Sequence, residues 1–267
     1  MKKIFLLSLC LVWTFCVCAQ RQTIGERIAP PAGYVREALP SGSFGAYLRE
    51  LPLLPAGSKV LLFNGEEKRN QACAYAVVDL DIGKRDLQQC ADAIIRLRAE
   101  HLYQQQKYTE ICFNFTNGFR ADYTKWAAGH RIRVSGNQVS WYAAGAEDYT
   151  YPTFRAYLDL VFVYAGTASL AGELVRTDYA ELRSGDVFIQ GGFPGHAVIV
   201  VDVAVHPQSG KRVYLLAQSY MPAQHIHVLT NPAHRTLSPW YELEPTRAGK
   251  VYIPEWTFEK SDLMRFP

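Results

Sequence analysis

The residues of this chain that could do chemistry are a thiol, an imidazole and an amide, in the order Cys90, His196 and Gln218. A thiol can act as a nucleophile, and an imidazole can accept its proton and pass it on. A polar side chain beside the imidazole can hold the ring in orientation. By residue type and role, these three predict a site for acyl transfer.

A predicted hairpin positions the imidazole and the amide. Residues 185–203 are typical of a short strand, a glycine-rich bend and a long apolar strand that opens on His196. The turn residues 206–210 and the apolar run Val213–Gln218 follow, which predicts two antiparallel strands. A turn centred near Gln208 places Gln218 beside His196 on the same face. The sequence is equally compatible with a plain sheet histidine capped by its neighbour.

A predicted helix positions the thiol. Asp86 can cap it, and Gln89 three residues on completes a pair like a capping box, so Cys90 falls in the first turn. A helix N-terminus favours a thiolate over a thiol and offers backbone donors to an oxyanion. The alternative is an inert buried thiol, because Cys90 shares the apolar helix face of Ile94 and Leu97.

The rest of the chain predicts an α+β fold in which a helix packs on an antiparallel sheet, with inserted helices and a small hairpin. The strand, helix, strand order around Cys90 also predicts a crossover with parallel strands. A tail rich in Pro and Trp is expected to wrap the surface. The expected strands are Lys59–Phe63, Cys73–Asp81, Tyr108–Phe115 and His225–Leu229, the hairpin arms are Arg131–Val134 and Val139–Tyr142, and the helices are Tyr123–Ala128, Tyr151–Tyr164 and one from Gly166 to about Val175.

The N-terminus predicts secretion. A basic start, an apolar run from Ile4 to Cys18 and small residues at its end are typical of a signal peptide, residues 1–19, with residues 20–267 forming a single α+β domain. We therefore expect a periplasmic or extracellular protein, and a lipid-anchored Cys16 or Cys18 is the less favoured alternative. No other run is long enough to span a bilayer, so no integral membrane segment is expected in the mature chain.

Charge and cysteine usage limit the classes of function further. Removing two of the 28 basic residues with the signal peptide leaves 26 against 25 acidic ones, which gives no support for nucleic-acid binding.

The mature chain keeps three cysteines, Cys73, Cys90 and Cys112. We expect Cys73 and Cys112 to form a disulfide between the strands that flank the Cys90 helix. No metal-ligand spacing typical of a structural zinc site occurs, and no cofactor is expected. His225 and His227 alternate on one strand face and could hold a metal, but with no acidic or cysteine ligand nearby the favoured interpretation is exposed strand histidines.

Two resemblances add to these inferences. The segment 185–200, with its Gly-Asp start and its histidine opening an apolar strand, resembles the histidine strand of papain-like cell-wall peptidases of the NlpC and CHAP type. That resemblance implies a papain-like core, the catalytic residues Cys90, His196 and Gln218, and a peptidoglycan or peptide substrate. The usual Asp before the nucleophile and Ser-Gly after it are absent here. The strings at 87–93, 113–119 and 195–202 are similar to an uncharacterised secreted bacterial family, domain-of-unknown-function family forty-eight forty-six.

The sequence therefore leaves two functions open. The first is a papain-like cysteine amidase or endopeptidase of the cell envelope. The alternative is a catalytically inactive envelope protein on the same fold that binds a glycan or a peptide through its Tyr- and Trp-rich surface. A Cys90 sulfur within about 4 Å of a His196 ring nitrogen would favour the enzyme.

Overall fold

An antiparallel nine-stranded sheet runs through the protein in the computed structural model, which describes residues 21–243 and 249–267. Its main path is β2-β11-β10-β9-β8-β15-β7, and β1 and β12 pair off this path with β9 and β10. The strands are β1 (Val35–Arg36), β2 (Ala74–Val77), β7 (Val175–Arg176), β8 (Val187–Gln190), β9 (His196–Val205), β10 (Arg212–Gln218), β11 (His227–Leu229), β12 (Tyr241–Leu243) and β15 (Leu263–Arg265).

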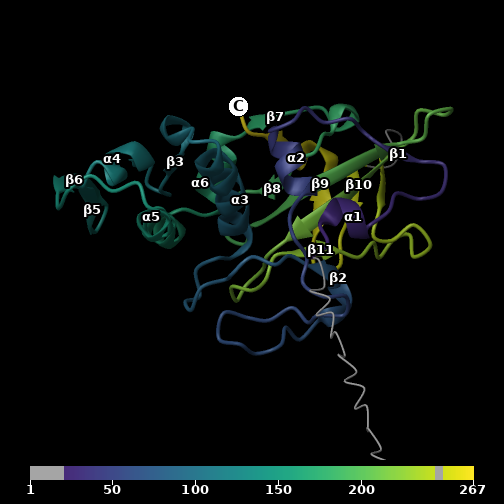
Figure 1. Ribbon diagram of the computed structural model, residues 1–267, viewed down its shortest axis with the longest axis horizontal. Coiled ribbons are helices and arrows are strands. Elements are labelled where there is room, and N and C mark those ends of the chain that lie inside the picture. Colours follow the sequence, from purple (N-terminus) through teal and green to yellow (C-terminus); the bar gives the residue numbers. More distant parts are fainter. Residues whose placement is uncertain (1–20, 244–248) are drawn as a thin grey trace, which may run out of the picture.

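Helices and three small hairpins pack against this sheet or lie to one side of it. In Figure 1 the sheet occupies the right half, the segment with α4, α5 and the β5–β6 hairpin lies at the left, and α3 stands between them. The helices are α1 (Ile24–Arg27), α2 (Phe44–Arg49), α3 (Cys90–Gln104), α4 (Tyr123–Ala127), α5 (Tyr151–Tyr164) and α6 (Thr167–Glu173). The hairpins pair β3 (Cys112–Asn114) with β4 (Arg120–Asp122), β5 (His130–Ser135) with β6 (Gln138–Ala143), and β13 (Lys250–Tyr252) with β14 (Thr257–Glu259).

Strand β9 is covered on both faces, and this organises the core. Successive side chains of a strand point to opposite faces. Ala197 and Ile199 belong to the apolar cluster that includes Ile94 and Leu97 of α3. Val198 and Val200 belong to a second cluster, which includes β13 and β14 residues. The sheet therefore separates a layer that contains α3 from a layer that contains the C-terminal hairpin.

A buried carboxylate attaches the N-terminal segment to β9. Asp202 is completely buried, and its two oxygens accept hydrogen bonds from Arg36 Nε and Arg49 Nε, each at 2.7 Å. Arg36 belongs to β1 and Arg49 ends α2, so both elements are held against the same strand. Two cationic partners compensate the cost of burying this charge.

The mixed α and β class with a large antiparallel sheet is confirmed, as are the β9–β10 hairpin, helix α5 and the β5–β6 hairpin. The predicted parallel crossover is wrong, because β2 belongs to the large sheet whereas β3 pairs only with β4, antiparallel, in a sheet of its own. The predicted strand at Lys59–Phe63 is reduced to isolated bridges at Leu61 and Leu62.

The predicted disulfide is also wrong. Cys73, Cys90 and Cys112 are all free thiols. Cys73 ends the 3₁₀ turn Gln71–Cys73 before β2, whereas Cys112 begins β3. The two cysteines therefore do not lie on neighbouring strands of one sheet, which was the premise of the pairing.

The C-terminal segment does more than wrap the surface. Trp240 is 2% exposed, and its Nε1 donates to the Ala29 carbonyl oxygen at 2.9 Å.

The predicted signal peptide, residues 1–19, lies outside the described residues. Across residues 21–243 and 249–267, no helix has the length and apolar character needed to cross a bilayer.

Candidate functional site

The thiol lies at the very start of α3. The helix begins at Cys90 with Gln89 as its N-cap, and the Asp92 carboxylate accepts from the Gln89 backbone N–H at 3.1 Å. The predicted cap, Asp86, lies four residues before the first helical residue; its Oδ1 accepts from the Ala223 backbone N–H at 2.6 Å instead. The prediction that Cys90 occupies the first turn is confirmed.

The resting state of this thiol differs from the prediction. Burial, with a smaller contribution from the nearby Asp92 carboxyl, raises the pKa of Cys90 to about 11. The backbone N–H groups of Ala91 and Ala197 lower the pKa, but by less than burial raises it. The predicted thiolate is therefore wrong for the resting protein: desolvation of the charged form outweighs the helix N-terminus.

The imidazole and the amide meet as predicted. Ala217 pairs with Ile199, so Gln218 and His196 share one face near the open end of the β9–β10 hairpin. His196 Nε2 lies 2.8 Å from Gln218 Oε1. Burial lowers the pKa of His196 to about 4, against the smaller opposing effect of the Gln218 hydrogen bond. The ring is therefore neutral near pH 7.

A carboxylate that the sequence did not indicate sets the direction of this hydrogen bond. Gln218 Nε2 donates to Glu255 Oε2 at 3.0 Å, so the amide oxygen is the atom that faces His196. An amide oxygen only accepts, so His196 Nε2 carries the hydrogen and Nδ1 keeps the lone pair. Glu255 lies in the segment between β13 and β14, and no local motif announces it.

Cys90 and His196 lie on different faces of the sheet. Ala197 belongs to the cluster that contains α3, and His196, its neighbour in the strand, points to the opposite face. There the rings of Tyr220, Trp256 and Phe258 surround the imidazole, with centroid separations of 4.9, 5.4 and 5.9 Å. In the described part of the chain no hydrogen bond joins Cys90 to His196. The structure thus brings His196 and Gln218 together and does not join Cys90 to them.

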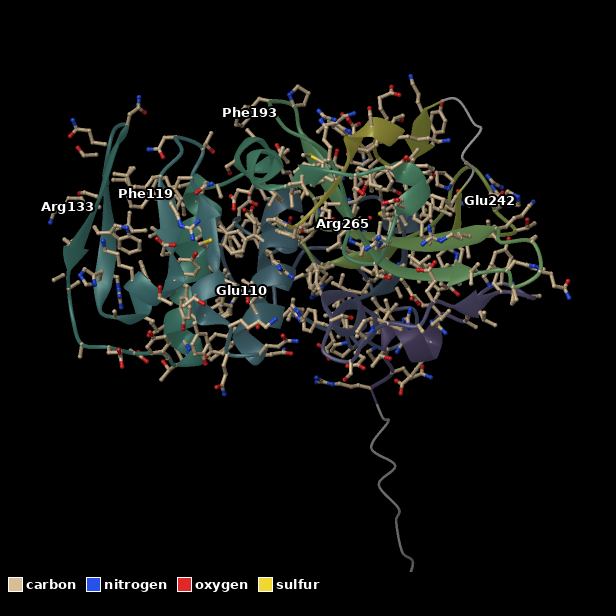
Figure 2. All side chains as sticks on the ribbon, turned by 90° about the horizontal axis from the view of Figure 1, so that it is seen from above. Glu110, Phe119, Arg133, Phe193, Glu242 and Arg265 are labelled. Carbon is tan, nitrogen blue, oxygen red and sulfur yellow. The ribbon has the colours of Figure 1, made fainter. Side chains whose placement is uncertain are left out.

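A cavity of about 450 Å³ opens over the N-terminus of α3. Its lining residues come from the α3 start and the segment before it, the end of α5 with the α5–α6 junction, the loop before β9, and two single positions after β3 and β10: Asp86, Leu87, Gln89–Asp92, Phe162, Val163, Ala165–Ala168, Gly192–Gly195, Thr116 and Met221. Cys90 is among them, and His196 and Gln218 are not. Three of these residues are large, exposed apolar side chains: Phe193 is 93% exposed, Met221 58% and Val163 46%. Figure 2 shows Phe193 at the periphery of the molecule.

One residue that lines the cavity, Asp92, has a buried oxygen without a hydrogen-bond partner. Asp92 is 6% exposed, and its Oδ1 has no hydrogen-bond partner, whereas Oδ2 caps the helix. Burial raises the pKa of Asp92 well above its ordinary value. An unsatisfied buried oxygen is costly, and protonation of the carboxyl lowers that cost.

The interpretation of His227 as an exposed strand histidine without acidic or cysteine neighbours is wrong. His227 is fully buried, and its Nε2 lies 3.6 Å from Cys73 Sγ. Glu255 is close to both. These neighbours come from distant parts of the sequence, so their spacing along the chain gave no sign of the cluster.

The comparison with known families adds one finding. The family model described as domain of unknown function 4846 matches residues 24–265. The chain belongs to that family. No curated protein and no solved structure matches the chain, so the papain-like resemblance has no structural counterpart among them.

Proposed function

We propose that this member of the domain of unknown function 4846 family is a cell-envelope protein that binds a peptide or glycan portion of peptidoglycan in the cavity over α3. The observation that carries the proposal is the group of exposed apolar side chains, Phe193, Met221 and Val163, gathered around that cavity. Contiguous exposed apolar surface around a hollow is typical of a binding site. The envelope location rests on the predicted signal peptide.

The chemistry of the cavity floor fits a ligand with amide or hydroxyl groups. The cavity lies at the N-terminus of α3, whose partial positive charge favours carbonyl or carboxylate oxygens. The Gln89 and Thr116 side chains, which also line the cavity, offer oxygen acceptors to a ligand N–H or O–H. Phe193 supplies an aromatic face against which a sugar ring or an apolar side chain can pack. Peptide stems and amino sugars both carry this combination of groups.

Binding is tested by titrating soluble peptidoglycan fragments into the mature protein and by co-sedimentation with insoluble peptidoglycan. Phe193→Ala and Met221→Ala should each weaken binding by about tenfold, because each truncates a rim contact. Tyr252→Ala is the matched control, since Tyr252 is 55% exposed but does not line the cavity. Absence of binding by the unaltered protein, or equal loss in the control, would contradict the proposal.

A thiol hydrolase is the second candidate, favoured by one observation: Cys90 lines the same cavity at a helix N-terminus. The catalytic roles of Cys90, His196 and Gln218 stay predictions. Cleavage of peptidoglycan fragments, measured as newly released amines, should be lost in Cys90→Ser if this candidate holds. His196→Ala then decides the base, because the predicted triad requires that cleavage be lost in this variant as well.

A further inference from the structure

Three metal-binding side chains meet on the sheet face away from α3. They are Cys73 before β2, His227 at the start of β11 and Glu255 between β13 and β14, and their ligand atoms lie within 4.8 Å of one another. Cys73 is 1% exposed and His227 is fully buried. Thiolate, imidazole and carboxylate together are a donor set that Zn²⁺ accepts.

The imidazole is oriented as a ligand. His227 Nδ1 lies 2.9 Å from the His225 carbonyl oxygen. A carbonyl only accepts, so Nδ1 carries the hydrogen and Nε2 keeps its lone pair, which faces the Cys73 sulfur at 3.6 Å and the Gln218 Nε2 donor at 3.4 Å. A bound ion would take the place of the Gln218 contact. A ring N–H donated to a backbone carbonyl is the usual outer contact of a histidine that ligates a metal.

The spacing of the two buried ligands fits a tetrahedral ion. Zn–S and Zn–N bonds of about 2.3 and 2.05 Å at a tetrahedral angle place sulfur and nitrogen about 3.5 Å apart. Cys73 Sγ and His227 Nε2 are 3.6 Å apart. A Glu255 oxygen lies within 4.8 Å of both of these atoms and supplies the third ligand.

We propose that Cys73, His227 and Glu255 form a Zn²⁺ site, with a water molecule as the fourth ligand. In the metal-free protein the Cys73 thiol donates to the Asn70 carbonyl oxygen at 2.9 Å. On binding, the S–H bond breaks and the proton leaves to solvent, while bonds form from the metal to the sulfur, to His227 Nε2 and to a Glu255 oxygen.

Lys68 is the internal competitor for this site. Its Nζ lies 2.9 Å from Glu255 Oε1 and 5.0 Å from the centre of the Tyr220 ring. A carboxylate has about four acceptor positions, so Lys68, Asn70 and Gln218 together do not exhaust Glu255. When the ion binds, the ammonium keeps its contact with the Tyr220 ring.

Cobalt titration tests the site independently of any activity. Mature protein freed of metal with a chelator is titrated with Co²⁺, a spectroscopic substitute for Zn²⁺. We expect a thiolate-to-cobalt charge-transfer band that saturates at one equivalent and is displaced by Zn²⁺. The band should be lost in Cys73→Ser and kept in Cys90→Ser and Cys112→Ser, which are matched controls because both cysteines are also free thiols.

A variant that leaves all three ligands intact covers the case in which Cys73→Ser fails to fold. Lys68→Met keeps the apolar stem and removes the competing charge, so the affinity for Co²⁺ should rise by at least about tenfold. No band in the unaltered protein at excess Co²⁺, a band that survives in folded Cys73→Ser, or an unchanged affinity in Lys68→Met would each overturn the proposal.

Discussion

The reactivity of Cys90 offers a quantitative test of the site electrostatics. Burial and the Asp92 carboxyl raise the pKa of the thiol from its ordinary 9.0 to about 11. A rise of two units lowers the thiolate fraction near pH 8 by about 100-fold, and alkylation should be slower by the same factor because only the thiolate reacts. The measurement is the iodoacetamide labelling rate of the folded protein from pH 7 to 10, assigned by peptide mass mapping and compared with a free thiol.

Asp92→Asn supplies the internal perturbation. Removing this carboxyl takes away the second cause of the shift, so the pKa of Cys90 should fall and its labelling rate near pH 8 should rise, although burial keeps it below that of a free thiol. Unfolding in urea should restore the rate of a free thiol. Labelling of folded Cys90 at the rate of a free thiol at pH 7 would refute the reasoning and would strengthen the case for a thiolate nucleophile.

Three further predictions concern stability and redox state. The pKa values of His196 and His227 are lowered to about 4 in the folded protein, against about 6.5 in the unfolded chain. Because the unfolded chain binds more protons between these two pH values, the free energy of unfolding should be full above pH 6.5 and fall by about 3 kcal/mol per histidine by pH 4. Urea unfolding across this pH range measures the fall, and a flat profile would contradict it. Asp202→Asn should lower the free energy of unfolding by about 3–5 kcal/mol, because both arginine partners lose their charge pair, and a change under 1 kcal/mol would argue against it. Thiol counting on denatured, unreduced mature protein should find three free thiols, and one would restore the disulfide.

Local patterns predicted most of the elements correctly. The apolar runs on either side of the turn near Gln208 specified the β9–β10 hairpin, and the long apolar stretch Tyr151–Tyr164 specified α5. The parallel crossover failed because the order of elements does not state which strand pairs with which. Cys112 illustrates this: its strand follows α3 in sequence but pairs with the next segment, β4.

The site was only partly predictable for a related reason. His196 and Gln218 are placed by a hairpin, which is a local structure with a register that the sequence constrains. Glu255 reaches the same point from 37 residues beyond Gln218, and Cys73 and His227 meet from 154 residues apart. Contacts of this kind depend on tertiary packing and leave no periodic trace in the sequence.

Whether Cys90 and His196 can meet depends on which face of the sheet His196 points to, and the sequence of strand β9 does not indicate that face. A strand whose apolar and polar residues alternate indicates which of its faces meets the core. The run Ala197–Val201 is apolar throughout because both faces are covered, so it gives no such indication. Since side chains alternate with a period of two, the face that receives α3 also fixes the direction of the histidine. In this fold Ala197, the smaller side chain, faces the helix. His196 therefore points into the aromatic layer with Glu255, and the thiol remains in the cavity on the other side.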